Sequence, residues 1–342
     1  MPLAMATKIL VGLSGGVDSA VAARLLQEQG LEIAGVCLRM HPYSDLSGAK
    51  AAAEQLGIPL IVEDQTALFD RVVRESFVEQ YCLGKTPNPC VLCNRYVKFE
   101  GLLQAAQKNG FDGIATGHYA GKTSVNGRLA VRRSPGPKDQ SYMLWGLTQT
   151  QLAQLHLPLT ELEKPAVREL ARKWGLSCAE APDSQEICFL PDGDHASYIE
   201  SLRGAFPQGN FVDTQGRVLG KHRGIIRYTI GQRKGLGIAL GEPMFVLKID
   251  AQANQVVLGR AREEYMPSAK VGQLHFGGVA SFEDGERFYI KIRSAAPAVP
   301  CTLRHGEQGA EVLFDTPQRA VTPGQSAVFY RDDWVAFGGI FE

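Results

Sequence analysis

The sequence contains no run of eighteen consecutive apolar residues. Because a helix that crosses a bilayer needs about 20 such residues, we expect no membrane-spanning segment and no membrane partner. Residues 1–16 also match a secretory signal poorly, since Lys8 is their only charged side chain and a glycine turn stands where a cleavage site would be. We therefore expect a cytoplasmic protein.

The sequence also lacks net charge, because 36 basic side chains balance 36 acidic ones. A basic footprint is the usual sign of nucleic-acid binding, so the bulk charge neither supports nor excludes such a partner. Basic residues do gather locally, within 128–138 and 221–234. Any nucleic acid would be steered by local clusters of charge rather than by the whole molecule.

No internal repeat or low-complexity segment is present, and 342 residues are more than one core usually holds. Apolar patterns in the first half predict strands at 8–13, 31–40, 58–64 and 112–119 and helices at 19–30, 46–57, 66–84 and 94–110. This alternation predicts an α/β domain with a doubly wound parallel sheet, whose ligands lie beyond the carboxyl ends of the strands. Asn94 is the predicted N-cap of the last of these helices.

The pattern changes after about residue 205, where short β-rich runs separated by turn residues replace the helical patterns. Such runs predict one or two small barrels or sandwiches. We expect an α/β domain over 1–205, a central β-rich domain over 206–270 and a C-terminal β-barrel over 271–342.

The string LSGGVDS at 13–19 follows the first predicted strand and opens the first helix. Gly15 and Gly16 allow a tight turn that brings backbone N–H groups close to an anionic ligand, and Asp18 adds a carboxylate at the helix start. The string is neither a Walker A loop nor the G-x-G-x-x-G dinucleotide fingerprint. It resembles the signature of the ATP-pyrophosphatase (PP-loop) superfamily, which attacks ATP at the α-phosphate and releases pyrophosphate. The resemblance implies ATP as a substrate, with Asp18 helping to position Mg²⁺.

Seven cysteines are present. In a cytosolic protein they indicate metal or redox chemistry more often than structural disulfides. Cys90 and Cys93 lie three residues apart in NPCVLCN, and Cys188 follows a Pro-Asp turn in PDSQEICFL. The others lie in apolar patterns and are predicted to be small core residues: Cys37, Cys82, Cys178 and Cys301.

Several strings together carry a resemblance to one family: GLSGGVDS, TPNPxxLCN followed by KF, ATGHYA, KDQSYML, ELEKPAVRELA, DSQEICF, TIGQRKGLGI and VTPGQSAVFY. They resemble the tRNA-specific 2-thiouridylases, and the matches extend from residue 12 to residue 330. This family replaces the C2 oxygen of the wobble uridine with sulfur after O2 has been adenylated. The resemblance implies a PP-loop domain, a small central domain and a C-terminal β-barrel. It also implies that the substrates are the anticodon arms of lysine, glutamine and glutamate tRNAs.

The resemblance further implies roles for individual residues. ATP would be bound by Gly12, Leu13, Ser14, Gly15, Gly16, Val17, Asp18, Ser19, Leu38 and Gly117. The tRNA would be contacted by Asn88, Pro89, Cys90, His118, Lys138, Asp139, Gln140, Arg293, Ser294 and Gln325. Cys188 would carry a persulfide delivered by a sulfur-relay protein, and Cys93 would be the nucleophile that forms a disulfide with Cys188 to release the product. Because this chemistry requires thiolates, we expect an exposed pair with a low pKa.

Cys90 departs from the family pattern, since many members carry aspartate at this position. A thiol with a reference pKa of about 8.5 does not replace a carboxylate as a general base. We favour, first, a 4Fe–4S cluster held by Cys90, Cys93 and Cys188, whose open iron binds hydrosulfide as the sulfur donor. A second interpretation has the three thiols work without metal. A third has them bind structural zinc with a histidine as fourth ligand.

Two functions of other classes also fit part of the sequence. A PP-loop ligase that transfers nitrogen to a small metabolite would use the glycine loop but neither Cys93 nor Cys188. A non-catalytic RNA-binding module would carry only a relic of the nucleotide loop. The intact Ser14, Asp18 and Ser19 argue against a relic.

Overall fold

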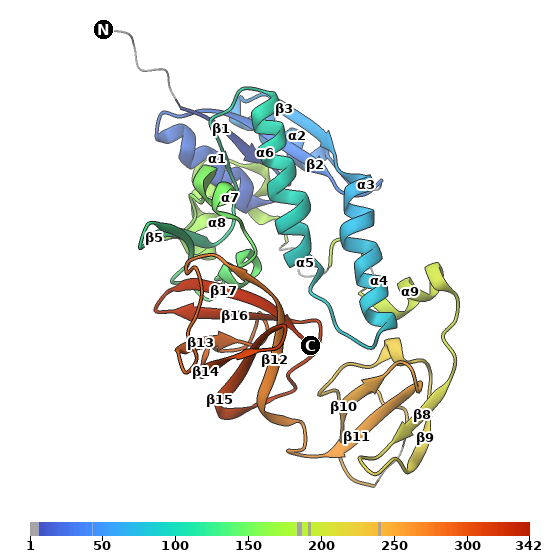
Figure 1. The fold of residues 1–342 in the computed structure, drawn as a ribbon. Helices are drawn as coiled ribbons and strands as arrows, with labels where there is room; N and C mark the ends of the chain where they lie inside the picture. Colours follow the sequence, from blue (N-terminus) through green and yellow to red (C-terminus); the bar gives the residue numbers. More distant parts are fainter. Residues whose placement is uncertain (1–6, 43, 183–186, 191–192, 239–240) are drawn as a thin grey trace.

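The structure is a computed structural model that describes residues 7–42, 44–182, 187–190, 193–238 and 241–342. Within these ranges the chain forms a five-stranded, a four-stranded and an eight-stranded sheet. Figure 1 shows the first of them at the top, the eight-stranded sheet below it and the four-stranded sheet at the lower right.

The N-terminal sheet is parallel throughout, with the strand order β3-β2-β1-β4-β7. Its strands are β1 (Lys8–Gly12), β2 (Glu32–Arg39), β3 (Leu60–Asp64), β4 (Gly113–Ala115) and β7 (Leu155–His156). Alternate residues of β1 face opposite sides, because successive side chains of a strand do so. Ile9 and Val11 join a core with α1 (Val17–Glu28), α2 (Ser47–Leu56) and α8 (Lys164–Lys173), whereas Leu10 packs with α6 (Phe99–Lys108) on the other face. The predicted doubly wound sheet is confirmed.

Two helices contain π-helical segments. Asp70–Arg74 joins α3 (Thr66–Phe69) to α4 (Glu75–Cys82), and Cys93–Lys98 joins α5 (Pro89–Leu92) to α6. The second of these helices therefore begins at Pro89, a residue whose missing N–H costs nothing at this position.

The predicted N-cap at Asn94 is wrong, because the N-cap residue is Asn88. Asn94 lies buried within the helix, where its Nδ2 donates to the backbone oxygen of Met143 at 3.0 Å. The longer helix leaves Cys90 and Cys93 on its first turns rather than in the preceding loop.

The described chain after about residue 205 is almost entirely β-structure, as predicted. After α7 (Gln149–Gln154) and α9 (His195–Arg203), a small sheet has the order β10-β11-β8-β9. Its strands are β8 (Gly209–Val212), β9 (Val218–His222), β10 (Met244–Asp250) and β11 (Gln255–Arg260). The domain boundaries at 205/206 and 270/271 remain a proposal, and the second of them falls within a strand, β12 (Tyr265–Phe276).

The C-terminal strands close into the predicted barrel, because β12 pairs with β15 on one side and with β17 on the other. The other strands are β13 (Arg287–Lys291), β14 (Val299–Gly306), β15 (Gly309–Arg319), β16 (Ser326–Arg331) and β17 (Trp334–Phe341).

A hairpin from the N-terminal half extends the barrel sheet. It consists of β5 (Ala120–Val125) and β6 (Arg128–Arg133), neither of which the sequence analysis predicts, and Arg132 pairs with Trp334 of β17. Nearby, Gly338 packs so closely on Trp145 that a Cβ at this glycine would lie 2.5 Å from the indole ring. The barrel is therefore seated directly on the α/β domain.

In the described part of the chain, no helix has both the length and the apolar character that crossing a bilayer requires.

Tyr142 provides a test of the interface between the α/β domain and the barrel. Its side chain is 0% exposed and its hydroxyl donates to the backbone oxygen of Ser326 at 2.9 Å. Tyr142→Phe should lower the free energy of unfolding by about 1–3 kcal/mol, because it leaves a buried acceptor without its partner. Equilibrium denaturation with urea measures the change. Tyr289→Phe is the control, since Tyr289 is 52% exposed on the same barrel, and equal effects of the two variants would contradict the prediction.

Candidate active site

The glycine loop lies where the order of the sheet reverses. β1 stands between β2 and β4, so the chain turns to one side after β1 and to the other when it returns as β4. Ligands of such sheets bind at this point, beyond the carboxyl ends of the strands. Leu38 is next to last in β2 and Gly117 follows β4 by two residues. The structure thus places both residues at the same edge as the loop 13–16.

Backbone segments approach each other closely around this loop. Gly15 has φ +83° and faces Gly48, whose backbone would lie 2.8 Å from a Cβ at position 15. A Cβ at Gly117 would lie 2.6 Å from the carbonyl carbon of Asp18. Only glycine fits at these two positions. Gly16 is the N-cap of α1 and has no side chain, so the first N–H groups of the helix can meet an anion.

Two hydroxyl groups fix the shape of the loop. The Ser19 Oγ donates to the backbone oxygen of Gly16 at 3.0 Å and accepts from the backbone N–H of Ser14 at 3.2 Å. The Oγ atoms of Ser14 and Ser19 lie 3.3 Å apart. These hydroxyls therefore shape the loop from within, and residues 12–19 lead without interruption from the end of β1 into the first turn of α1.

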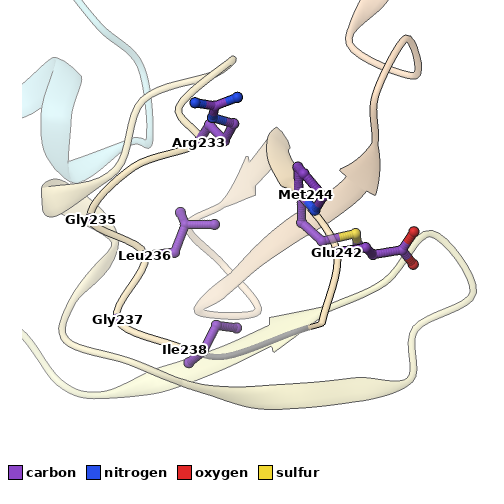
Figure 2. A pocket seen from close by; sticks show the side chains of 8 residues that line it. Arg233, Gly235, Leu236, Gly237, Ile238, Glu242 and Met244 are labelled. Carbon is purple, nitrogen blue, oxygen red and sulfur yellow. The ribbon is translucent and has the colours of Figure 1, made fainter.

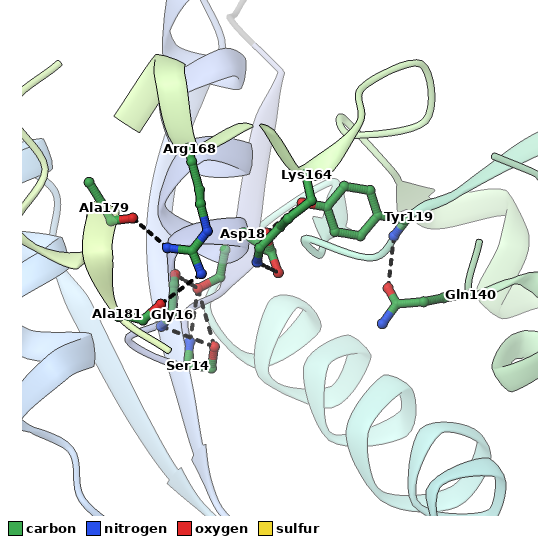
Figure 3. Close-up of polar contacts among 10 residues, drawn as sticks. Ser14, Gly16, Asp18, Tyr119, Gln140, Lys164, Arg168, Ala179 and Ala181 are labelled. Atoms are coloured by element: carbon green, nitrogen blue, oxygen red, sulfur yellow. Dashed lines mark hydrogen bonds and ion pairs between the residues drawn. The ribbon is translucent and has the colours of Figure 1, made fainter. Parts of the chain in front are cut away.

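Asp18 is the charged centre of the site (Figure 3). The Tyr119 hydroxyl donates to its Oδ1 at 2.6 Å, and the Lys164 Nζ donates to its Oδ1 at 2.8 Å and its Oδ2 at 2.9 Å. The sequence analysis assigns no role to Tyr119 or Lys164. Both lie within strings on which the family resemblance rests, ATGHYA and ELEKPAVRELA. Their presence in these strings is the sequence feature that could have identified them.

Neighbouring residues hold these partners in place. Gln140 accepts through its Oε1 from the backbone N–H of Tyr119 at 2.8 Å. Arg168, one turn after Lys164 on α8, donates to the backbone oxygens of Ala179 and Ala181 at 2.7 and 2.9 Å. Figure 3 shows these contacts around the first turn of α1.

The three thiols lie close enough to one another to affect each other's pKa values. Cys90 and Cys93 are three residues apart on one helix, a spacing that places them on the same side. Cys93 packs against a cluster that contains Phe69, Phe77 and Val97. Both neighbours of Cys188, Ile187 and Phe189, pack against the same cluster. Residues 183–186 of the string DSQEICF lie outside the described residues.

The thiols do not have the low pKa values that the sequence analysis expects. Desolvation by the surrounding protein raises the pKa of Cys93 to about 11, and the charges of Cys188 and Cys90 raise it further against the lowering effect of Lys98. Desolvation also raises the pKa values of Cys90 and Cys188. The expectation was wrong because the single charge of Lys98 does not outweigh the loss of solvent. At neutral pH the free protein holds these groups as thiols.

The remaining cysteines follow the prediction in part. Cys37, Cys178 and Cys301 are buried, whereas Cys82 is half-buried at the end of α4. Within the described ranges no group of three or more His, Cys, Asp or Glu side chains is placed to hold a metal ion. Structural zinc, which takes four protein ligands in a closed site, does not fit this part of the chain. A 4Fe–4S cluster is held by Cys thiolates, which is the donor type that Cys90, Cys93 and Cys188 would supply.

Tyr142 lies beside two of the residues predicted to contact tRNA, Asn88 and Arg293. Arg293 and Asn88 both act on its hydroxyl, although burial is the main cause that raises its pKa. Asn88 also lies 3.6 Å from the sulfur of Met143. Pro89 is buried, Cys90 and Arg293 are exposed, and Ser294 is half-buried. Residues from two distant parts of the chain thus meet beside the start of α5.

Two other residues predicted to contact tRNA, Asp139 and Gln325, form hydrogen bonds to the protein's own backbone. Asp139 accepts from the backbone N–H groups of Ser134 and Ser141 at 3.2 and 3.1 Å, and Lys138 beside it is exposed. Gln325 donates through its Nε2 to the backbone oxygen of Thr86 at 2.7 Å, and the Thr86 N–H donates to the Pro323 oxygen at 2.9 Å. The barrel therefore supports the segment that leads to Cys90.

His118 lies between the nucleotide loop and the thiol-bearing helix. Its ring stacks on Phe99 with a centroid distance of 5.6 Å, and its Nδ1 lies 2.9 Å from the Thr116 hydroxyl. Burial and the charge of Lys98 lower its pKa to about 3, so it is neutral at physiological pH. Its neighbour Tyr119 contacts Asp18. Residues 118–119 therefore connect the nucleotide loop to the helix that carries Cys90 and Cys93.

The central domain has a hollow of its own, shown in Figure 2. It is lined by Arg233, Gly235, Leu236, Gly237, Ile238, Glu242, Pro243 and Met244. Its described lining residues carry one arginine and one glutamate among apolar residues and glycines.

The raised pKa of Cys93 predicts how this thiol reacts. In a Cys90→Ala background, alkylation of Cys93 by iodoacetamide should accelerate by about tenfold per pH unit between pH 7 and 10, because only the thiolate reacts. Lys98→Met should slow the reaction at every pH in this range, since Lys98 lowers the pKa of Cys93. Mass spectrometry of the Cys93 peptide gives the rates. Lys108→Met at the far end of α6 is the control, and a rate that levels off below pH 9 would contradict the prediction.

Comparisons with known proteins match three successive parts of the chain. Residues 7–192 match a family model described as the tRNA methyl transferase HUP domain, residues 197–260 the corresponding PRC-barrel domain, and residues 269–341 the aminomethyltransferase beta-barrel domain.

Curated relatives match over nearly their full lengths. The tRNA-specific 2-thiouridylase MnmA of Acetivibrio thermocellus is 44% identical over 98% of this chain and 99% of its own. That of Lachnoclostridium phytofermentans is 45% identical over 97% and 98%. A solved 4-thiouridine synthetase–RNA complex with bound ATP has a TM-score of 0.38 and 18% identity over 58% of this chain and 50% of that chain.

Proposed function

The chain belongs to the family of tRNA-specific 2-thiouridylases, and from this premise we propose how its own residues carry out the reaction. The enzyme replaces the C2 oxygen of a tRNA uridine with sulfur and consumes ATP. The observation that carries the proposal is the short link 118–119, whose tyrosine contacts Asp18 and whose histidine stacks on Phe99, directly after the π-helical segment that begins at Cys93. A nitrogen-transferring ligase would have no use for thiols at this place.

ATP binds across the loop 12–19, with its phosphates on the first N–H groups of α1 and its adenosine against the backbone of Leu38 and Gly117. The support for this placement is the reversal of the sheet at β1 and β4 and the backbone approach that Gly15 permits. Mg²⁺, when bound, neutralises phosphate charge, and Asp18 fits the carboxylate that this ion takes alongside phosphate ligands.

The first chemical step activates the uridine. Its O2 attacks the α-phosphorus of ATP, the bond from that phosphorus to the bridging oxygen breaks, and pyrophosphate leaves with the electron pair. O2 then carries AMP and has become a leaving group. Helix N–H groups at the phosphates stabilise the charge that develops during this displacement.

Sulfur transfer follows at the thiols. The terminal sulfur of a Cys188 persulfide, received from a sulfur-relay protein, attacks C2, and AMP leaves with the oxygen. Cys93 then loses its thiol proton to water and attacks the Cys188 sulfur, and the electron pair of the broken S–S bond stays on the sulfur bonded to C2. The products are 2-thiouridine and a Cys93–Cys188 disulfide, which a dithiol reductant must open before the next cycle.

These steps give Cys90 no role, and a 4Fe–4S cluster, as the alternative to the persulfide and disulfide steps, would supply one. Cys90, Cys93 and Cys188 would hold it, and its open iron would bind hydrosulfide as the sulfur source. The three thiols act on one another electrostatically, which supports them as a common set of ligands.

The tRNA lies over the start of α5 and the adjoining face of the barrel, with uridine near Cys93. Exposed Cys90, Lys138 and Arg293 support this surface. Asp139, Gln140 and Gln325 act mainly by holding the surrounding loops. The substrates are the lysine, glutamine and glutamate tRNAs, whose anticodon arms present the wobble uridine. We also propose that the enzyme acts in the cytoplasm.

Substitution of the two cysteines tests the reaction. Cys93→Ser and Cys188→Ser should each reduce 2-thiouridine formation by at least about a hundredfold, because a hydroxyl neither carries a persulfide nor closes the disulfide. Pyrophosphate release with unmodified tRNA should persist in both variants. Nucleoside mass spectrometry and a pyrophosphate assay give the two rates, with Cys82→Ser as the control. Wild-type thiolation by both serine variants would refute the proposed chemistry.

The cluster has a separate test, on protein purified without oxygen. We expect a broad visible absorption band and about four irons and four acid-labile sulfides per chain, lost in Cys90→Ala. A colourless, iron-free protein that thiolates tRNA from a persulfide donor would refute the cluster and leave the persulfide steps in place.

A further inference from the structure

The loop at 13–19 lacks the lysine that other nucleotide loops carry. In a Walker A loop, a lysine next to the glycines reaches the β- and γ-phosphates. Here the positions after Gly15 and Gly16 hold valine, aspartate and serine, and the nearest charge on the loop is negative. A multiply charged phosphate chain at this loop would lie beside Asp18, so a cation from elsewhere in the chain is needed.

Lys164 is placed to supply that charge. It is the first residue of α8, a helix that packs on α1 through Val167 and Ala171. Its side chain is only 12% exposed, and its Nζ reaches both carboxylate oxygens of Asp18, on the first turn of α1. The ammonium group therefore stands at the positive end of α1, where phosphates bind in loops of this kind.

Arg168 does not fill the same role. It is the next basic residue on this face of α8, and its guanidinium group donates to the backbone oxygens of Ala179 and Ala181. These bonds hold it against the 177–181 segment. Lys164 by contrast bonds to the carboxylate that would meet the nucleotide's metal ion.

Stability alone gives little reason for the Lys164–Asp18 pair. Taking an ammonium group largely out of water costs free energy that a single ion pair roughly restores. Asp18 already receives the Tyr119 hydroxyl and lies at a helix N-terminus, which favours a carboxylate. The carboxylate is also 33% exposed, so it remains open on one side.

We propose that Lys164 is a phosphate-binding residue that exchanges partners when Mg·ATP binds. In the free protein its Nζ bonds to Asp18; in the complex Asp18 turns to the metal ion and Lys164 donates to a phosphate oxygen. This inference rests on the proposed ATP-dependent function and adds a residue to it. It predicts that Lys164 senses the phosphates and not the nucleoside.

Binding measurements without tRNA test the exchange. Isothermal titration with Mg·ATP and with adenosine is compared for wild type, Lys164→Met and Lys164→Arg. Lys164→Met should weaken Mg·ATP binding by about tenfold to a hundredfold, since it removes a charged hydrogen bond. Adenosine affinity should stay within about twofold, and Lys164→Arg should recover most of the loss. Lys173→Met is the matched control, because Lys173 is exposed at the other end of α8.

An Asp18→Asn background separates phosphate binding from simple neutralisation of Asp18. If Lys164 contacts a phosphate, Lys164→Met should still weaken Mg·ATP binding by about tenfold in this background. No further loss there would overturn the inference. The double variant leaves no unpaired carboxylate at position 18, so it remains informative if Lys164→Met alone fails to fold. Wild-type protein that binds no Mg·ATP would instead refute the proposed function.

Discussion

The carboxylate of Asp18 is the point on which the candidate site depends. Asp18 lies on the first turn of α1, and its carboxylate bonds to Tyr119, which follows β4, and to Lys164 at the start of α8. These three segments are far apart in the sequence. Around Asp18 the backbone is packed so closely that Gly15 and Gly117 admit no side chain. An ion pair that is partly open to solvent adds little to stability. Its value lies in placing three segments around one small volume.

The nucleotide half of this site could be read from the sequence because its signals are local. A strand, two glycines and a helix start lie within a dozen residues, and the apolar periodicity of the flanking elements identifies the sheet. Tyr119 and Lys164 could not be assigned in this way, because their roles arise only when β4 and α8 meet α1. A local pattern predicts an element but not which distant side chain reaches it.

The errors also have physical causes. Asn94 is a good capping residue, but Pro89 begins the helix five residues earlier and turns Asn94 inward. The hairpin β5–β6 was missed although Asn126-Gly127, with φ of 49° and 78°, is a strong hairpin turn. The thiols could be recognised as a set, but their pKa values depend on desolvation by residues that the spacing of cysteines does not reveal.

The contact between Thr86 and the segment 323–325 has a consequence for how the enzyme is made. Gln325 follows Thr86 by 239 residues, so a ribosome completes the segment leading to Cys90 long before it makes the side chain that secures it. The nascent α/β domain can form its nucleotide loop early. The segment that leads to Cys90, however, lacks its contact with the barrel until the barrel has been synthesised. Translation thus separates the two halves of the site in time, and the sulfur chemistry is the half that matures last.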